Sequence, residues 1–177
     1  MKVNIGNFPK GNGERKVKVE ISDHDCWNLD STLAYIIAPA LRKLKEIKCG
    51  GPFVSDADVP DKLKSTAVKK TKKDISNGTD KNWFKRWDYV LDEMIFAFES
   101  VNSDWEEQFY SGEIDIQFVP TDKKFKNPLT GKKEEMSEMV KGPKDTFKVD
   151  YVGSKKVEER MQNGFRLFGL YYRALWD

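Results

Sequence analysis

The stretch that decides the fold is Trp-Phe-Lys-Arg-Trp-Asp-Tyr-Val-Leu-Asp-Glu-Met-Ile-Phe-Ala-Phe-Glu, which occupies residues 83–99. At about 100° per residue, its apolar side chains fall on one broad arc, as they do in a helix that packs against a core. The arc consists of Trp83, Trp87, Val90, Leu91, Met94, Ile95 and Phe98. The pattern predicts a helix over about 81–102 that buries this face.

Three carboxylates, Asp88, Asp92 and Glu99, lie along one border of the arc. Carboxylates one helical turn apart can share a divalent cation, because Mg²⁺ and Mn²⁺ prefer oxygen ligands. Such a row is equally typical of a helix face that is solvated or joined to a neighbour by salt bridges. Both interpretations stay open here, and the second is favoured because charged rows are more often structural.

The remaining pattern predicts two more helices. One is expected to begin near Asn28 or Asp30, which are good capping residues, and to end at Cys49-Gly50. Pro39 lies inside it and is expected to kink it. The other is expected over about 154–175.

Short alternating stretches predict strands. Residues 16–21 alternate apolar and polar side chains, which predicts a strand whose Val17, Val19 and Ile21 face inward. Residues 113–118 form a second candidate strand, and residues 146–151 are expected to return beside it. The chain therefore predicts one α+β domain, residues 1–177, with about three main helices packed with a small antiparallel sheet.

Bulk composition narrows the classes of function. The chain has 177 residues, of which 34% are charged, and a net charge of +2, which is too small to indicate nucleic-acid binding by itself. No cysteine or histidine spacing fits a zinc site, so no cofactor is expected. Neither a signal peptide nor an apolar run of membrane-spanning length is present, which predicts a cytoplasmic protein.

A long polar connection at about 52–82 precedes the central helix. Connections of this length are usually functional or disordered. Its basic run includes Lys69 and Lys70, and it is followed by Trp83, Arg86 and Trp87. Cations beside aromatic rings suit phosphates and bases, which makes these five residues candidates for nucleotide binding. A solvated loop beside core aromatics is the more common outcome.

Two residues of the last helix are further candidates. Arg160 projects into the apolar arc of that helix, where a buried guanidinium needs a partner. The carboxylates of the central helix are its expected partners, and such a pair would consume the proposed metal site. Asn163 could face a ligand, although it falls near the exposed side.

Several stretches together resemble a family of small, uncharacterised proteins of tailed bacteriophages. They are residues 27–34 (Trp-Asn-Leu-Asp-Ser-Thr-Leu-Ala), residues 52–60 around Pro52-Phe53-Val54, residues 86–99, and residues 163–177. The chain departs from the relatives at Cys49, where they carry a histidine, and at Ser55, where they carry an acidic residue. The resemblance implies no activity, but it implies an accessory protein acting in the cytoplasm of the host bacterium.

Three hypotheses follow. The first is a non-enzymatic binder that counters host defence, for example by sequestering a nucleotide signal with Trp83 or Trp87 and Arg86. The second is a metal-dependent nucleotide hydrolase that uses Asp88, Asp92 and Glu99 with Mg²⁺ or Mn²⁺. The third is an inhibitor that binds a host protein through residues 52–82. A homo-oligomer is left open, and no membrane partner is expected.

Overall fold

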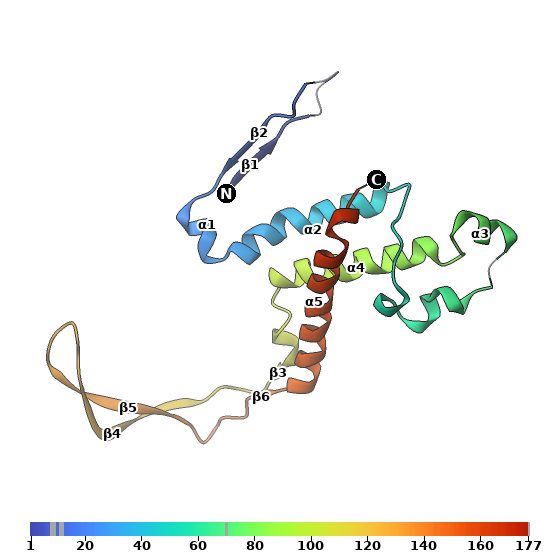
Figure 1. Cartoon of the computed structure of the whole chain (residues 1–177). Helices are drawn as coiled ribbons and strands as arrows, with labels where there is room; N and C mark the ends of the chain where they lie inside the picture. The colour runs from blue at the N-terminus through green and yellow to red at the C-terminus, as the bar shows by residue number, and fades with distance from the viewer. Residues whose placement is uncertain (8–9, 11–12, 70, 177) are drawn as a thin grey trace. The chain divides into compact units, whose positions relative to one another are not determined.

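The structure is a computed structural model that describes residues 1–7, 10, 13–69 and 71–176. Where the sequence predicts one domain, the contacts separate the chain into two compact units (Figure 1). Unit 1 contains residues 1–104 and 157–177, and unit 2 contains residues 105–156. We describe each unit by itself.

Unit 1 is built on three long helices, namely α2 (Leu29–Ile47), α4 (Trp83–Val101) and the part of α5 (Tyr151–Tyr171) from Val157 onward. The N-terminal elements are β1 (Lys2–Ile5), β2 (Val17–Glu20) and the short helix α1 (Asp23–Trp27). A 3-10 turn, η5 (Tyr172–Ala174), follows α5. The three helices appear at the predicted places because their apolar periodicity is long and uninterrupted, except at Pro39, which α2 contains.

The core of unit 1 forms where α4 meets its neighbours. Trp87, Val90, Leu91 and Met94 of α4 are fully buried, as the helical pattern predicts. Ile95 of α4 also belongs to the buried apolar cluster. The rest of the cluster comes from α2, from the segment after it and from α5: Leu41, Val54, Val59, Leu167 and Tyr171. The central helix is therefore the element around which unit 1 packs.

The polar connection before α4 is built from short turns. Three 3-10 turns, η1 (Asp56–Asp58), η2 (Asp61–Leu63) and η3 (Ser65–Ala67), are followed by the short helix α3 (Lys72–Asn77). Val54 and Val59 anchor the first of these turns in the core. Much of the predicted loop thus has defined local structure.

The β1–β2 hairpin corrects one prediction. Val17, Val19 and Ile21 were expected to face a core, but all three are exposed. Among the residues that the structure describes, β2 pairs only with β1, from Lys2 opposite Glu20 to Ile5 opposite Val17. Strict alternation predicts a strand correctly, but a buried face also needs a covering layer, and these strands form a sheet of two.

Unit 2 is mainly a long antiparallel hairpin. β4 (Ile116–Lys126) pairs with β5 (Lys133–Lys141), while β3 (Tyr110–Ser111) pairs with β6 (Lys148–Val149); the 3-10 turn η4 (Glu107–Phe109) precedes β3. The prediction that residues 146–151 return beside 113–118 holds at one end, where the backbone N–H of Thr146 donates to the carbonyl of Glu113 and β6 lies beside β3. It is wrong for residues 116–118, which pair with β5. A turn at Asn127–Gly131 folds the chain back at once, and Gly131 has a positive φ of 69° that suits it.

The predicted fold class is confirmed: three long helices are combined with small antiparallel sheets of two strands each. Within the described part of the chain, no helix combines the length and the apolar character that a bilayer span requires.

Candidate functional site

The carboxylate row of α4 is engaged by α2. Each of the three carboxylates forms a salt bridge with a cation of α2 or with Lys48, the residue that follows α2. The partners occur in opposite order along the two segments, so α2 and α4 run antiparallel here. The pairs are Arg42 with Glu99, Lys45 with Asp92 (Nζ to Oδ1, 2.5 Å), and Lys48 with Asp88 (Nζ to Oδ1, 2.5 Å). Hydrogen bonding to Glu99 raises the pKa of Arg42.

This seam answers the question that the sequence left open about the row. Asp88, Asp92 and Glu99 serve as partners of cations, which is the salt-bridge interpretation. Among the described residues, no group of three His, Cys, Asp or Glu side chains is placed to hold a metal ion. The Mg²⁺ or Mn²⁺ interpretation therefore has no geometric support in this structure.

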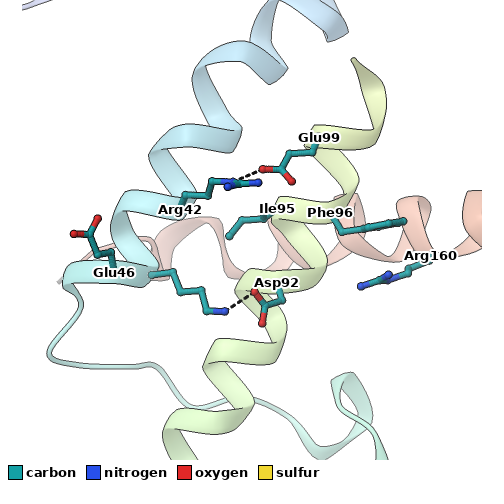
Figure 2. Close-up of a pocket in the computed structure, with 8 residues that line it drawn as sticks. Arg42, Glu46, Asp92, Ile95, Phe96, Glu99 and Arg160 are labelled. Atoms are coloured by element: carbon teal, nitrogen blue, oxygen red, sulfur yellow. Dashed lines mark hydrogen bonds and ion pairs between the residues drawn. The ribbon is translucent and has the colours of Figure 1, made fainter. Parts of the chain in front are cut away.

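A charged groove lies along the same seam (Figure 2). Its volume is about 770 Å³. The lining consists of Arg42, Lys45, Glu46, Asp92, Ile95, Phe96, Glu99 and Arg160. Cations and carboxylates are equally numerous in this lining, so the groove carries both signs of charge. An anionic ligand would have to compete with the carboxylates that already pair with the cations of the groove.

Arg160 forms the end of this groove and is paired with α4, as predicted, but with a different carboxylate. Its guanidinium makes three hydrogen bonds to Glu93, of 2.8, 3.0 and 3.1 Å, and lies 3.7 Å from the centroid of the Phe96 ring. Glu93 is buried, whereas 47% of the Arg160 side chain is exposed. Hydrogen bonding to Glu93 raises the pKa of Arg160. The pair joins α5 to α4 and leaves the carboxylate row untouched.

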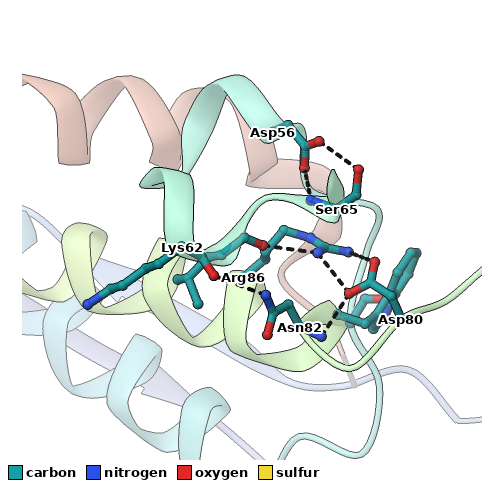
Figure 3. Close-up of polar contacts among 9 residues, drawn as sticks. Asp56, Lys62, Ser65, Asp80, Asn82 and Arg86 are labelled. Atoms are coloured by element: carbon teal, nitrogen blue, oxygen red, sulfur yellow. Dashed lines mark hydrogen bonds and ion pairs between the residues drawn. The ribbon is translucent and has the colours of Figure 1, made fainter. Parts of the chain in front are cut away.

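Arg86 and Trp87, two candidates for nucleotide binding, belong to the core. Arg86 donates two hydrogen bonds to Asp80, of 3.0 and 2.8 Å, and both side chains are only 2% exposed (Figure 3). Trp87 is fully buried, with its ring centroid 5.9 Å from that of Tyr171. Neither side chain can reach a ligand here, because the apolar arc of α4 faces inward and Arg86 lies at its edge.

The buried Arg86–Asp80 pair closes the connection before α4 onto that helix. Arg86 also donates to the carbonyl of Leu63 at 3.1 Å, and Asn82 donates to the carbonyl of Lys62 at 3.1 Å (Figure 3). A buried ion pair with extra hydrogen bonds is costly to break from one side. The pair therefore acts as a structural clamp.

Asp56 reinforces the same segment. It accepts hydrogen bonds from the backbone N–H and the hydroxyl of Ser65, both at 2.6 Å, which lower the pKa of the Asp56 carboxyl (Figure 3). These contacts hold the two 3-10 turns η1 and η3 together.

Asn163 is part of a polar network between α5 and η1. Its side-chain oxygen accepts two hydrogen bonds from Arg166, which in turn donates to Asp58 at 2.7 Å. Tyr171 donates to the other oxygen of Asp58 at 2.8 Å and accepts from the backbone N–H of Ser55 at 3.1 Å. Burial, with the Asp58 contact, raises the pKa of Tyr171 to about 12. Asn163 thus orients Arg166 within a structural network.

The other predicted ligand residues are dispersed. Trp83 is half-buried and donates from its indole N–H to the carbonyl of Gly51 at 3.3 Å. Lys69 is exposed. Lys70 lies outside the described residues. The structure brings Trp83 and Arg86 together, with the guanidinium carbon of Arg86 5.9 Å from the centroid of the Trp83 ring. Arg160 and Asn163 instead belong to the separate contacts of α5 described above.

Sequence reasoning missed Glu93 and Asp80, which make the buried ion pairs. A signal for Glu93 existed: the helical wheel places it, with Arg86, on the border of the apolar arc opposite the carboxylate row. No comparable signal marks Asp80. It lies in the segment before α4, and its pairing with Arg86 depends on how that segment folds back onto the helix.

Unit 2 presents an unpaired apolar surface on its long hairpin, which we call the β4–β5 arm (residues 116–141). Phe118 and Met139 are opposite each other in the register and are 69% and 64% exposed. Ile116, two residues before Phe118, points to the same face and is also exposed. The arm thus carries a row of large apolar side chains in contact with water.

Comparison of the chain with models of protein families, with curated proteins and with solved structures finds no significant match.

Proposed function

We propose that this protein is a non-enzymatic accessory protein of a phage, which acts in the host bacterial cytoplasm by binding a host protein and so counters host defence. The phage context rests on the sequence resemblance. The observation that carries the binding role is the exposed apolar face of the β4–β5 arm, with Phe118, Met139 and Ile116.

The β4–β5 arm should be more stable when a partner covers it than when it is surrounded by water. An isolated hairpin of two strands is marginally stable in water, and three strands or a covering layer are needed for independent stability. Burying a Phe or Met side chain contributes about 1.5–3 kcal/mol. A partner that covers Phe118 and Met139 would therefore stabilise the arm and gain affinity from the same contact.

The partner that fits is a host protein with an exposed strand edge or an extended apolar segment. In the described residues, β4 and β5 pair only with each other, so each has an outer edge that a third strand could extend. Three lysines lie in β4 (Lys123, Lys124 and Lys126), whereas β5 has lysines only at its two ends and three glutamates between them. Lysine on an edge discourages unselective pairing. A selective partner strand beside β4 must therefore supply carboxylates opposite these lysines.

Affinity capture from host lysate with the full chain as bait tests this proposal. We compare wild type with a double variant, Phe118→Lys with Met139→Lys, and with a control, Leu129→Lys. Leu129 is 94% exposed and lies in the turn at the tip of the arm. We expect one stoichiometric partner that the control retains and the double variant loses.

A defence assay in the host supplies the functional measurement. Expression of wild type and of Leu129→Lys should restore plaque formation by a phage that the defence otherwise blocks, and the double variant should not. A double variant that is fully active in both assays would overturn the arm as the binding surface.

A second candidate, sequestration of a nucleotide signal, is supported by the groove in which Arg42, Lys45 and Arg160 lie beside Phe96. Thermal-shift measurements with cyclic and linear nucleotides test it. A shift that Arg42→Ala with Lys45→Ala abolishes would support it, and no shift with any nucleotide would remove it. Consumption of a nucleotide only with Mg²⁺ or Mn²⁺, lost in Asp92→Asn, would instead identify the hydrolase.

A further inference from the structure

The β4–β5 arm consists of two halves, because its pairing changes register between Pro120 and Lys124. Residues 116–120 pair with β5 before the shift, and residues 124–126 pair with it after the shift. A bulge of this kind bends a strand and redirects the side chains beyond it. We call residues 123–133, which include the turn, the arm tip. β3 precedes the arm and β6 follows it at the other end, so the tip is the end away from them (Figure 1).

The arm tip concentrates positive charge. Its 11 residues contain five lysines and no carboxylate, whereas the whole chain has a net charge of only +2, so the rest of the protein is net negative. All five lysines are exposed: Lys123, Lys124, Lys126, Lys132 and Lys133. Within the described residues, only Lys124 among them forms a salt bridge, at 3.5 Å to Glu135, and an exposed pair of this kind is weak. Such a cluster attracts polyanions.

Two of these lysines lie against each other across the strands. Lys126 is directly opposite Lys133 in the register, so both side chains leave the same face of the hairpin. Like charges in this position destabilise a strand pair. An anion between the two ammonium groups would remove the repulsion and accept a charge-assisted hydrogen bond from each. A phosphate group is an anion that lysine commonly binds in this way.

The turn of the arm tip presents apolar side chains to water. The side-chain oxygen of Asn127 accepts from the backbone N–H groups of Leu129, at 2.9 Å, and Thr130, at 3.3 Å. These hydrogen bonds fix the turn locally. Leu129 is 94% exposed, and Pro128 is exposed beside it. Leucine and proline are among the side chains that DNA-binding proteins insert between base steps.

We propose that the arm tip binds double-stranded DNA, with its lysines on the phosphates and Leu129 against the bases. Paired strands lie about 4.8 Å apart, and a two-stranded ribbon enters the major groove of B-DNA, which is about 12 Å wide. The lysines lie on both strands, so they can reach phosphates on both sides of a groove. A flat lipid surface would meet the turn but not the lysines behind it. This inference goes beyond the proposed protein contact, which uses Phe118 and Met139 in the other half of the arm.

Fluorescence anisotropy of a labelled duplex of about 20 base pairs, titrated with the full chain at several salt concentrations, tests the proposal. We expect binding in the micromolar range at about 50 mM salt. The logarithm of the binding constant should fall with the logarithm of the salt concentration with a slope of about −4, because each phosphate contact contributes about −0.9.

The variant that tests the charge is Lys126→Gln with Lys133→Gln. It should weaken binding at about 50 mM salt at least tenfold and reduce the size of the salt slope by about two. The control is Lys144→Gln with Lys148→Gln, which removes the same charge from exposed lysines of unit 2 outside the arm and should bind as wild type does. The tip variant should melt no lower than wild type, because it loses a like-charge pair.

Leu129→Ala tests the contact with the bases. It should weaken binding roughly tenfold and leave the salt slope unchanged, because it removes apolar contact and no charge. Vesicles of phosphatidylserine offer the same phosphate chemistry without a groove. Binding to these vesicles but not to the duplex would overturn the proposal. No binding of wild type at about 50 mM salt would also overturn it, as would equal binding by wild type and the Lys126 and Lys133 double variant.

Discussion

A close contact between α4 and α5 at Gly164 tests how unit 1 is held together. At Gly164 of α5, an added Cβ would lie 2.3 Å from the carbonyl oxygen of Glu93 and 2.5 Å from the Cβ of Ala97. Both neighbours belong to the rigid body of α4 and cannot turn aside like a flexible side chain. Gly164→Ala must therefore separate the two helices.

Two opposing effects set the magnitude. Alanine in a helix interior is favoured over glycine by about 1 kcal/mol. Overpacking of a well-packed contact costs about 1–3 kcal/mol and occasionally more. Separation of the helices would also loosen the Arg160–Glu93 pair, which lies one turn away. We expect Gly164→Ala to lower the free energy of unfolding by roughly 1–3 kcal/mol.

Gly169, on the same helix, supplies a matched control. An added Cβ there meets nothing within 4 Å, so Gly169→Ala should raise the free energy of unfolding by about 0.5–1 kcal/mol. Urea titration followed by tryptophan fluorescence measures both, since Trp87 is fully buried in unit 1. The reasoning is refuted if Gly164→Ala is as stable as Gly169→Ala.

Three further changes test other parts of the structure. Asp80→Asn leaves a buried guanidinium without its charge partner and should cost about 3–5 kcal/mol in urea titration, whereas Asp92→Asn, at an exposed pair, should cost less than about 1 kcal/mol. The pKa of Tyr171 is raised to about 12 from an ordinary value of about 10. The contribution of the Tyr171 hydroxyl to the free energy of unfolding is therefore complete below pH 10 and declines as pH rises to 12. In alkaline unfolding curves, the stability difference between wild type and Tyr171→Phe should shrink over that interval. Gly112→Ala, at a positive φ of 82° with the added Cβ 2.2 Å from a backbone oxygen, should speed limited proteolysis of residues 105–156.

The helices could be predicted from the sequence because their signal is local and long. The strands of unit 2 were harder to predict from the sequence. β5 reads Lys-Glu-Glu-Met-Ser-Glu-Met-Val-Lys, in which Val140 is the single β-branched residue and no residue is aromatic, although both kinds are typical of strands. It forms because the turn after β4 returns the chain beside that strand, so its structure depends on its neighbour more than on its own composition.

The candidate site was predicted less well, for a physical reason. A helical wheel shows which face of α4 a side chain lies on, but it does not show what covers that face. Arg86 was expected at a ligand and is instead paired with Asp80, which the preceding segment brings to it. For the row of Asp88, Asp92 and Glu99, the sequence left a metal site and a salt-bridged face open and offered Arg160 as the partner. The structure pairs the row with Arg42 and Lys45 of α2 and with Lys48, which follows that helix.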